Sequence, residues 1–474
     1  MPGGDCKSPL GIAGIFGAIL LPINQRSTTA AVCKFTTANS FTLMRNKYVL
    51  SFLLFAVGHP SVSNAQVKAI HFGKVVDGQG KVISDAVVLV EADRIVKVGP
   101  EKEVSIPANA ESIDLKAYTA IPGLIDAHTH MSFYWDKTPG TTPWGQLGTL
   151  GSGVTLFLAQ ENARKTLETG VTTVRDLGSF DNIDISLRNL INRGALLGPR
   201  MFVAANGLHV TSTPYKVGAI PDAGQCDGVE GVQRAARQQL AAGADWIKMY
   251  GSTGSDQDVT GFQTFSYEEM KAAADVAHYA GKRIAIHSYG PDGARDAVRA
   301  GTNTVEHAID MDDATLATMV RKGIIYVPTV EHNRYYIAHK DEYGYDAKVV
   351  AGLNQYVDKN FATLKRAMKA NVKIAMGSDA VFTGFGENTR ELEWFVKAGM
   401  SPAQALKTAT TTGAEMLGME RELGAIAPGY LADLVAVEGD PLKDITVVIN
   451  HVKWVMKAGK IVVDQTQPAA AKTH

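Results

Sequence analysis

The sequence predicts an α/β protein in which a TIM-like (β/α)8 barrel is joined to a small composite β-sandwich domain formed by both chain ends. Three observations indicate this fold. Strand-like and helical patterns alternate along residues 123–417, strand-rich segments flank that region on both sides, and metal-binding residue types recur at the ends of the predicted strands. A chain of 474 residues is long enough for one large domain and one smaller domain.

The middle region contains eight short β-branched runs, separated by stretches rich in Ala, Leu and charged residues such as Val232–Ala242 and Tyr267–Ala280. Eight β-then-α units over about 300 residues match the size of a (β/α)8 barrel. A doubly wound open sheet is the competing topology, but no G-x-G-x-x-G motif follows the first strand. The predicted strands are Ile121–Ala127, Thr172–Leu177, Met201–Ala205, Trp246–Tyr250, Arg283–His287, Thr304–His307, Ile324–Pro328 and Lys373–Ser378.

The two flanking regions have the character of short strands and turns. Ala86–Val90 is a strongly apolar run, Ala432–Val437 resembles it, and Trp454–Val463 has two strand-like halves around a Gly turn. We therefore predict that residues 66–122 and 418–466 together form one composite β domain, with the barrel between them.

Composition excludes some classes of function. The formal net charge is -1 and the chain has no long basic run, so nothing indicates binding to nucleic acid. The hydrophobic content of 45% and charged content of 20% are typical of a soluble globular protein. Cys6 and Cys33 lie in an N-terminal segment that we expect to be removed, so Cys226 alone cannot form an internal disulfide.

The N-terminus has the pattern of an export signal. A short positive region at Met44–Lys47 precedes an apolar run at Tyr48–Gly58, which is too short to span a membrane, and Ser63–Ala65 supplies small residues for cleavage. We expect cleavage after Ala65, a periplasmic or secreted protein, and an upstream extension at residues 1–43. The alternative is that the apolar run stays attached as a membrane anchor. No later stretch is apolar enough to form a stable membrane span.

A His-x-His motif ends the first predicted strand of the barrel, in Asp126-Ala127-His128-Thr129-His130. Residues i and i+2 of a strand point to the same side, so His128 and His130 can direct two imidazoles at one point. Taken alone, the motif fits two partly exposed histidines as well as it fits a metal site.

Four further residues lie at the ends of other predicted strands. Lys248 is in the fourth strand, His287 ends the fifth, His307 ends the sixth, and Asp379 follows the eighth. The C-terminal ends of barrel strands meet at one mouth, where catalysis takes place in this architecture. A lysine in an apolar strand is costly unless it is neutralised, paired or chemically altered. Asp379 alone fits a helix N-cap, but the six positions together predict a metal centre.

With these motifs the chain resembles the amidohydrolase superfamily over about residues 68–463. Within the superfamily it resembles the imidazolonepropionase-like branch, which includes secreted dipeptidases, prolidases and ochratoxin-type amidases. The general resemblance is carried by Pro122–His130, Gly170–Thr173, Gly377–Asp379 and Gly424–Val435, and the branch is indicated by Trp246–Lys248 and Val305–Ala308.

The resemblance implies two divalent metal ions, zinc by analogy, bridged by an N6-carboxylated Lys248. It also implies a homo-oligomer. Asp379 is the implied catalytic residue, which takes a proton from the metal-activated water and passes it to the leaving amine. The first ion is assigned to His128, His130 and Asp379, and the second to His287 and His307.

Four residues near the strand ends are candidate substrate contacts. His209 follows the third strand, Tyr250 and Tyr289 each lie two residues past a ligand position, and His332 follows the seventh strand, where it and Arg334 can anchor an anionic group. The alternatives are a satisfied loop histidine, aromatic packing and solvated surface residues, respectively.

These features predict a hydrolase that cleaves the amide or peptide bond of a small carboxylate-bearing molecule, such as a dipeptide, an N-acyl amino acid or an ochratoxin-like compound. Hydrolysis of cyclic amides, lactones or phosphate esters at the same metals is the alternative. A non-catalytic barrel that serves as a binding module is disfavoured because all six ligand types are present. The aromatic loop at 131–153 is either a lid over an apolar substrate or an oligomer contact.

Overall fold

The computed structural model describes residues 66–147, 149–211, 224–253 and 262–466. The expected signal peptide, its cleavage site after Ala65 and the upstream extension lie outside the described residues. Within the described residues, no helix combines the length and apolar character that a membrane crossing needs.

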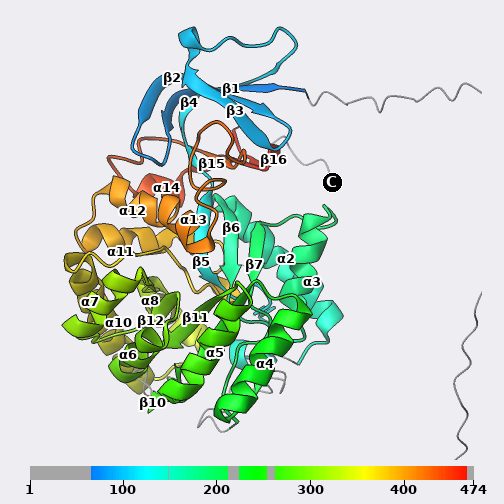
Figure 1. The fold of residues 1–474 in the computed structure, drawn as a ribbon. Coiled ribbons are helices and arrows are strands. Elements are labelled where there is room, and N and C mark those ends of the chain that lie inside the picture. The colour runs from blue at the N-terminus through cyan, green and yellow to red at the C-terminus, as the bar shows by residue number, and fades with distance from the viewer. Residues whose placement is uncertain (1–65, 148, 212–223, 254–261, 467–474) are drawn as a thin grey trace, which may run out of the picture. The chain divides into compact units, whose positions relative to one another are not determined.

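Strands from both ends of the chain pair in one seven-stranded sheet (Figure 1). The register places Val435 opposite Ile121, so an antiparallel pair joins the two ends of the chain. Across the sheet the strands are β16 (Lys460–Asp464), β15 (Val452–Lys457), β14 (Leu434–Val437), β4 (Glu111–Pro122), β1 (Lys68–Val76), β2 (Val82–Glu91) and β3 (Arg94–Pro100).

This sheet curls over its own apolar face. The rings of Phe72 in β1 and Trp454 in β15 lie 6.5 Å apart, edge to face, although two strands separate them in the sheet order. Strands spaced about 4.8 Å apart in a flat sheet would put those residues about 14 Å apart. The curl encloses a separate core that includes Ile70, Val88 and Leu115, as in a small β-sandwich.

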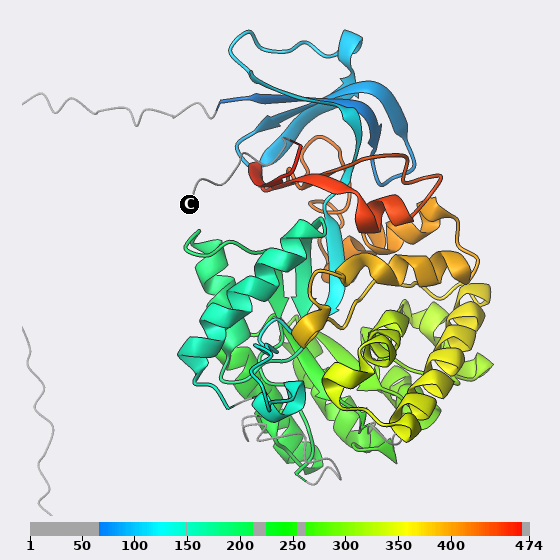
Figure 2. The same ribbon diagram turned by 180° about the vertical axis from the view of Figure 1, so that it is seen from behind.

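The middle region forms two parallel sheets that begin where the composite sheet ends. Figure 2 shows β5 running from the composite sheet into the body of the helices. The first sheet contains β5 (Leu124–Thr129), β6 (Val171–Asp176) and β7 (Arg200–Val203), and the second contains β8 (Trp246–Tyr250), β11 (Arg283–Ser288), β12 (Thr304–His307) and β13 (Ile325–Val327).

Backbone hydrogen bonds close the two parallel sheets into one ring. On one side, the segment 373–380 fits between β13 and β5, with Tyr326 N donating to Lys373 O at 2.9 Å and Ala127 N donating to Met376 O at 2.8 Å. On the other side, Leu208 just past β7 donates to Lys248 O at 2.8 Å. The ring has eight parallel segments, and the predicted (β/α)8 barrel is therefore confirmed.

Helices follow the strands and surround the ring (Figures 1 and 2). Several ends carry the expected signals: α5 begins with a capping box at Ser266 and Glu269, and α4 and α6 end at Gly243 and Gly301 in the left-handed region. The helices are α1 (Pro143–Gln146), α2 (Ser152–Glu168), α3 (Ile183–Asn192), α4 (Gly228–Ala242), α5 (Tyr267–Tyr279), α6 (Pro291–Ala300), α7 (Asp313–Lys322), α8 (Val330–Ala338), α9 (Lys340–Tyr343), α10 (Ala347–Lys369), α11 (Glu391–Lys397), α12 (Pro402–Thr408), α13 (Thr411–Leu417) and α14 (Thr446–Asn450). Short 3-10 turns lie at Glu101–Glu103, Phe382–Gly384 and Asn388–Arg390. Two strands of two residues each, β9 (Ser252–Thr253) and β10 (Phe262–Gln263), pair in antiparallel fashion.

Replacing Trp454 by alanine should lower the free energy of unfolding by about 3–5 kcal/mol, because the side chain is buried in the composite core and the cavity left behind cannot collapse fully. Urea denaturation measures this change. The control is Phe157→Ala on α2, where the side chain is 72% exposed and the expected change is below about 0.5 kcal/mol. Equal, small effects of both substitutions would contradict the packing described here.

Candidate metal centre

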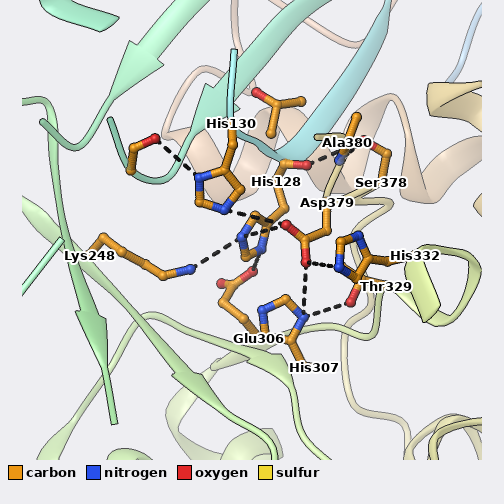
Figure 3. Close-up of polar contacts among 12 residues, drawn as sticks. His128, His130, Lys248, Glu306, His307, Thr329, His332, Ser378, Asp379 and Ala380 are labelled. Atoms are coloured by element: carbon orange, nitrogen blue, oxygen red, sulfur yellow. Dashed lines mark hydrogen bonds and ion pairs between the residues drawn. The ribbon is translucent and has the colours of Figure 1, made fainter. Parts of the chain in front are cut away.

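Asp379 lies at the middle of a buried cluster at the C-terminal ends of the barrel strands (Figure 3). Its Oδ1 atom is 3.5 Å from His128 Nε2 and 3.4 Å from His130 Nε2. One ligand atom from each of these three residues lies within 4.8 Å of the others. Two ligand atoms at about 2.1 Å from one tetrahedral ion stand about 3.4 Å apart, so the spacing fits a shared cation.

The strand geometry explains why both imidazoles face Asp379. His128 and His130 leave β5 on the same side, with ring centroids 5.3 Å apart. Each ring uses Nδ1 for a hydrogen bond away from the cluster, His128 to Glu306 Oε2 at 2.8 Å and His130 to Gly178 O at 3.1 Å. The Nε2 atoms are therefore the ones left to bind a metal ion.

Lys248, His287 and His307 line the other side of the same space. The Nζ atom of Lys248 is 3.2 Å from His128 Nε2, and the His307 ring lies 4.8 Å from the His128 ring. His287 and His307 pack with ring centroids 4.5 Å apart. The structure thus brings all six predicted ligands together from five segments of the barrel. Lys248 lies at the middle of β8 rather than at the strand end that the sequence predicted.

Burial determines the protonation of these groups. It holds the pKa values of His128 and His287 well below the usual range, and the charge of Lys248 lowers them further. Burial also lowers the pKa of Lys248 to about 8, against the opposing effect of the Glu306 and Asp379 carboxylates. Neutral imidazole is the form that binds a metal ion, and burial favours this form for His128 and His287.

Asp379 differs from the other groups because it stays ionised. Burial alone would raise its pKa, but the surrounding imidazoles of His332, His128 and His130 hold the pKa below its usual range. Asp379 and His307 also adopt left-handed backbone, with φ of 51° and 71°. Strain of this kind is kept where the surrounding structure fixes a functional side chain.

The donor set fits a divalent ion of the zinc type, which prefers imidazole nitrogen and carboxylate oxygen. His128, His130 and Asp379 offer one complete group of donors, and His287 and His307 offer two more nitrogens beside it. The ammonium of Lys248 is the exception, because it has no lone pair to give while it is protonated.

His332 lies nearer to the centre than a solvated surface residue would. Its Nε2 atom is 3.4 Å from Asp379 Oδ2, and its side chain is 10% exposed. Arg334, two residues further along α8, forms an ion pair with Glu331 on the same helix, so its charge is already compensated. A role of either residue in anchoring a substrate stays a prediction.

The two predicted tyrosine contacts lie against the ligands. The Tyr250 ring is 5.0 Å from Lys248 Nζ, and the Tyr289 ring is 4.5 Å from the His287 ring. His209 hydrogen-bonds through Nδ1 to Gly207 O at 3.1 Å, within its own loop. Both tyrosines thus pack beside candidate ligands, and their contact with a substrate stays a prediction, while the loop bond of His209 fits its alternative as a satisfied histidine.

Aromatic residues from the loop after β5 pack on one side of the centre. Phe133 stacks on His130 with centroids 4.7 Å apart and on Phe180 at 5.1 Å. Trp144 meets Phe382 edge to face at 5.0 Å. These contacts place part of the aromatic loop at 131–153, predicted as either a lid or an oligomer contact, against the candidate ligand His130.

Several residues that position the ligands were not identified from the sequence. Asp126 accepts hydrogen bonds from the backbone of His128 at 3.1 Å and Ser378 at 2.9 Å, and so ties β5 to the segment that carries Asp379. Arg175 and Glu306 are fully buried beneath the centre. Charged residues inside apolar strands are rarely buried without a partner, and this was the signal that could have revealed them.

Comparison with known proteins shows which family the chain resembles in sequence and in fold. The model of the amidohydrolase family matches residues 119–462. An ochratoxinase from Aspergillus niger is 28% identical over 488 residues, covering 95% of each chain, and an imidazolonepropionase from Anaeromyxobacter dehalogenans is 25% identical over 432 residues, covering 81% of this chain and 92% of the relative. The crystal structure of a Xaa-Pro dipeptidase with bound methionine superposes with a TM-score of 0.75 at 30% identity, covering 84% of this chain and 99% of that one.

Zinc should stabilise the metal-stripped protein, because an ion that binds only the folded state shifts the folding equilibrium. At about 100 times its Kd, zinc should raise the free energy of unfolding by about 2.7 kcal/mol. His130→Ala should reduce this gain, whereas His278→Ala should leave it unchanged, since His278 is exposed on α5. Chemical denaturation with and without zinc measures both, and an undiminished gain in His130→Ala would contradict the site.

Proposed function

Because this chain belongs to the amidohydrolase family, we propose that it hydrolyses the amide or peptide bond of a small molecule at the six-residue centre. One observation carries the proposal: imidazoles, a lysine and a carboxylate from five segments of the barrel converge on one buried space at the barrel mouth. The relatives named as hydrolases of this family support the same class of reaction.

In this proposal two zinc ions occupy the centre. His128, His130 and Asp379 hold one, and His287 and His307 hold the other. When bound, the ions supply Lewis acidity, which lowers the pKa of a water molecule and draws electrons from the substrate carbonyl. The remaining steps belong to the side chains of the chain itself.

Asp379 moves the proton. Its carboxylate is ionised, with Oδ1 facing His128 and His130 and Oδ2 facing His332. It accepts the proton as the water O–H bond breaks and the new C–O bond forms. It then donates that proton to the amine nitrogen as the C–N bond breaks, so one residue serves first as base and then as acid.

Lys248 completes the centre after it reacts with carbon dioxide. Burial lowers its pKa to about 8, which increases the fraction of neutral amine available for attack. The nitrogen lone pair forms a bond to the carbon of CO2, and a proton leaves the nitrogen for solvent. The resulting carbamate would be an anion with two oxygen donors, so Lys248 would become a ligand whose charge offsets part of the repulsion between two cations.

The proposed substrate is a small amide with a free carboxylate, such as a dipeptide or an N-acyl amino acid. The relatives' names, ochratoxinase and Xaa-Pro dipeptidase, support this class. Phe133 beside His130 is placed to contact an apolar group of such a molecule, and Tyr250 and Tyr289 are placed to donate hydrogen bonds to it. Dipeptides and N-acyl aromatic amino acids, scored for released amine, are therefore the test panel.

Asp379→Asn and His287→Asn should each lower kcat/KM by about 1,000-fold or more on whichever panel compound is cleaved, because one removes the proton carrier and the other a ligand. The matched control is His451→Asn, an exposed histidine of the composite domain, which should keep normal kinetics. Circular dichroism checks that each variant is folded. Amide hydrolysis by folded Asp379→Asn protein at the normal rate would contradict the assigned role.

Reconstitution should depend on bicarbonate if Lys248 becomes a carbamate. We expect metal-stripped protein in CO2-free buffer to recover activity slowly with zinc alone and faster with zinc plus bicarbonate. Lys248→Ala should show no bicarbonate effect. Equal recovery of the wild-type protein with and without bicarbonate would rule out the carbamate. It would not affect the assignment of the other five ligands.

A further inference from the structure

Two oppositely charged residues lie beneath the metal centre and take no part in the proposed chemistry. Arg175 in β6 and Glu306 in β12 are both 0% exposed, and their side chains meet inside the barrel with Nη2 of Arg175 2.9 Å from Oε1 of Glu306. A buried ion pair adds little stability compared with apolar packing, so its presence here calls for another explanation.

Arg175, in β6, is fixed by side-chain contacts with three other strands of the barrel. Beyond Glu306, its Nε donates to Ala127 O at 2.6 Å and its Nη1 donates to Thr304 Oγ1 at 2.8 Å. Its guanidinium plane also lies over the Trp246 ring, 4.6 Å from the centroid. Since β6, β5, β12 and β8 all take part, the guanidinium has little freedom to move.

Glu306 connects the fixed guanidinium of Arg175 to the candidate ligand His128. Its Oε1 accepts from Arg175 and Thr304, and its Oε2 lies 2.8 Å from His128 Nδ1 (Figure 3). Because Glu306 is paired with the guanidinium of Arg175, its carboxylate is placed as an acceptor, and this favours the tautomer in which His128 donates from Nδ1. The lone pair of Nε2 then faces Asp379 and the space for the ion.

The Nδ1 atoms of the neighbouring ligands have partners that fix the ring tautomer less strictly. His130 Nδ1 meets the neutral carbonyl of Gly178, and His307 Nδ1 meets the hydroxyl of Thr329, which can donate as well as accept. His307 Nδ1 also lies 3.9 Å from Asp379 Oδ2, so among these three histidines only His128 has a carboxylate within hydrogen-bond distance of Nδ1. His128 also lies nearest to Lys248, whose Nζ is 3.2 Å from its Nε2.

We propose that the Arg175–Glu306 pair is a positioning device that fixes the ring and tautomer of His128 and thereby sets the affinity for the ion held by His128, His130 and Asp379. Arg175 is required because an isolated carboxylate at this depth would be too costly to keep ionised. This inference rests on the proposed function only in placing an ion at that group of ligands.

The test compares two buried carboxylates, each paired with an arginine. Glu306→Gln keeps the shape but removes the charge that faces His128. The control, Asp433→Asn, removes a carboxylate that is 5% exposed and pairs with Arg200 at 2.7 Å, at the opposite, N-terminal ends of the barrel strands. Zinc affinity is measured by competition with a chromophoric chelator, and the free energy of unfolding of the metal-free protein is measured by urea.

In Glu306→Gln, the zinc ion held by His128, His130 and Asp379 should bind about 10–100-fold less tightly than in the wild-type protein. This is the usual effect of losing a ligand's hydrogen-bond partner. Asp433→Asn should bind zinc within about 2-fold of the wild-type protein, whatever its loss of stability. Glu306→Gln protein that is folded and binds zinc as tightly as the control would overturn the proposal.

Thr304→Val provides a milder variant in case Glu306→Gln does not fold. It keeps both charges and removes only the hydroxyl that contacts Arg175 and Glu306, so a loss of zinc affinity of about 5-fold is expected. Unchanged affinity in this variant would then overturn the proposal. Wild-type protein that takes up no zinc would instead contradict the proposed function, so the two failures are distinguishable.

Discussion

Removal of water from a cluster of polar side chains is the constraint on which the rest of the structure depends. Four imidazoles around a lysine and a carboxylate share a space where exposure is a few per cent at most, apart from His287 at 8%. Such groups tolerate burial only when each has partners. The closed barrel satisfies this requirement because its strand ends bring ligands from distant parts of the sequence to one place.

Hydrogen bonds beyond the ligands fix the geometry. Asp126 joins the first strand of the ring to the segment that carries Asp379, and Glu306 joins the sixth strand to the first. Glu391 plays a similar part further out, where it accepts the backbone N–H groups of Val330 and Glu331 at the start of α8 and so orients the helix that carries His332. The ligands are therefore set on rigid elements rather than on free loops.

The strands and the clustering of the six candidate ligands could be predicted from the sequence because they depend on local patterns. The alternation of β-branched runs with helical stretches located all eight segments, and strand periodicity placed His128 and His130 on one side. Partners far apart in sequence could not be predicted in this way: nothing near Glu306 indicates that it meets Arg175, which lies on the second strand of the ring. The closeness of His332 to Asp379 likewise depends on how α8 leaves its strand, which no local pattern encodes.

The central claim is that two divalent ions share this space, and anomalous X-ray diffraction at the zinc edge tests it most directly. Crystals grown with zinc should show two peaks at the barrel mouth about 3.5–4 Å apart, one beside His128, His130 and Asp379 and one beside His287 and His307. Crystals grown with zinc that show one anomalous peak or none between these side chains would contradict the account.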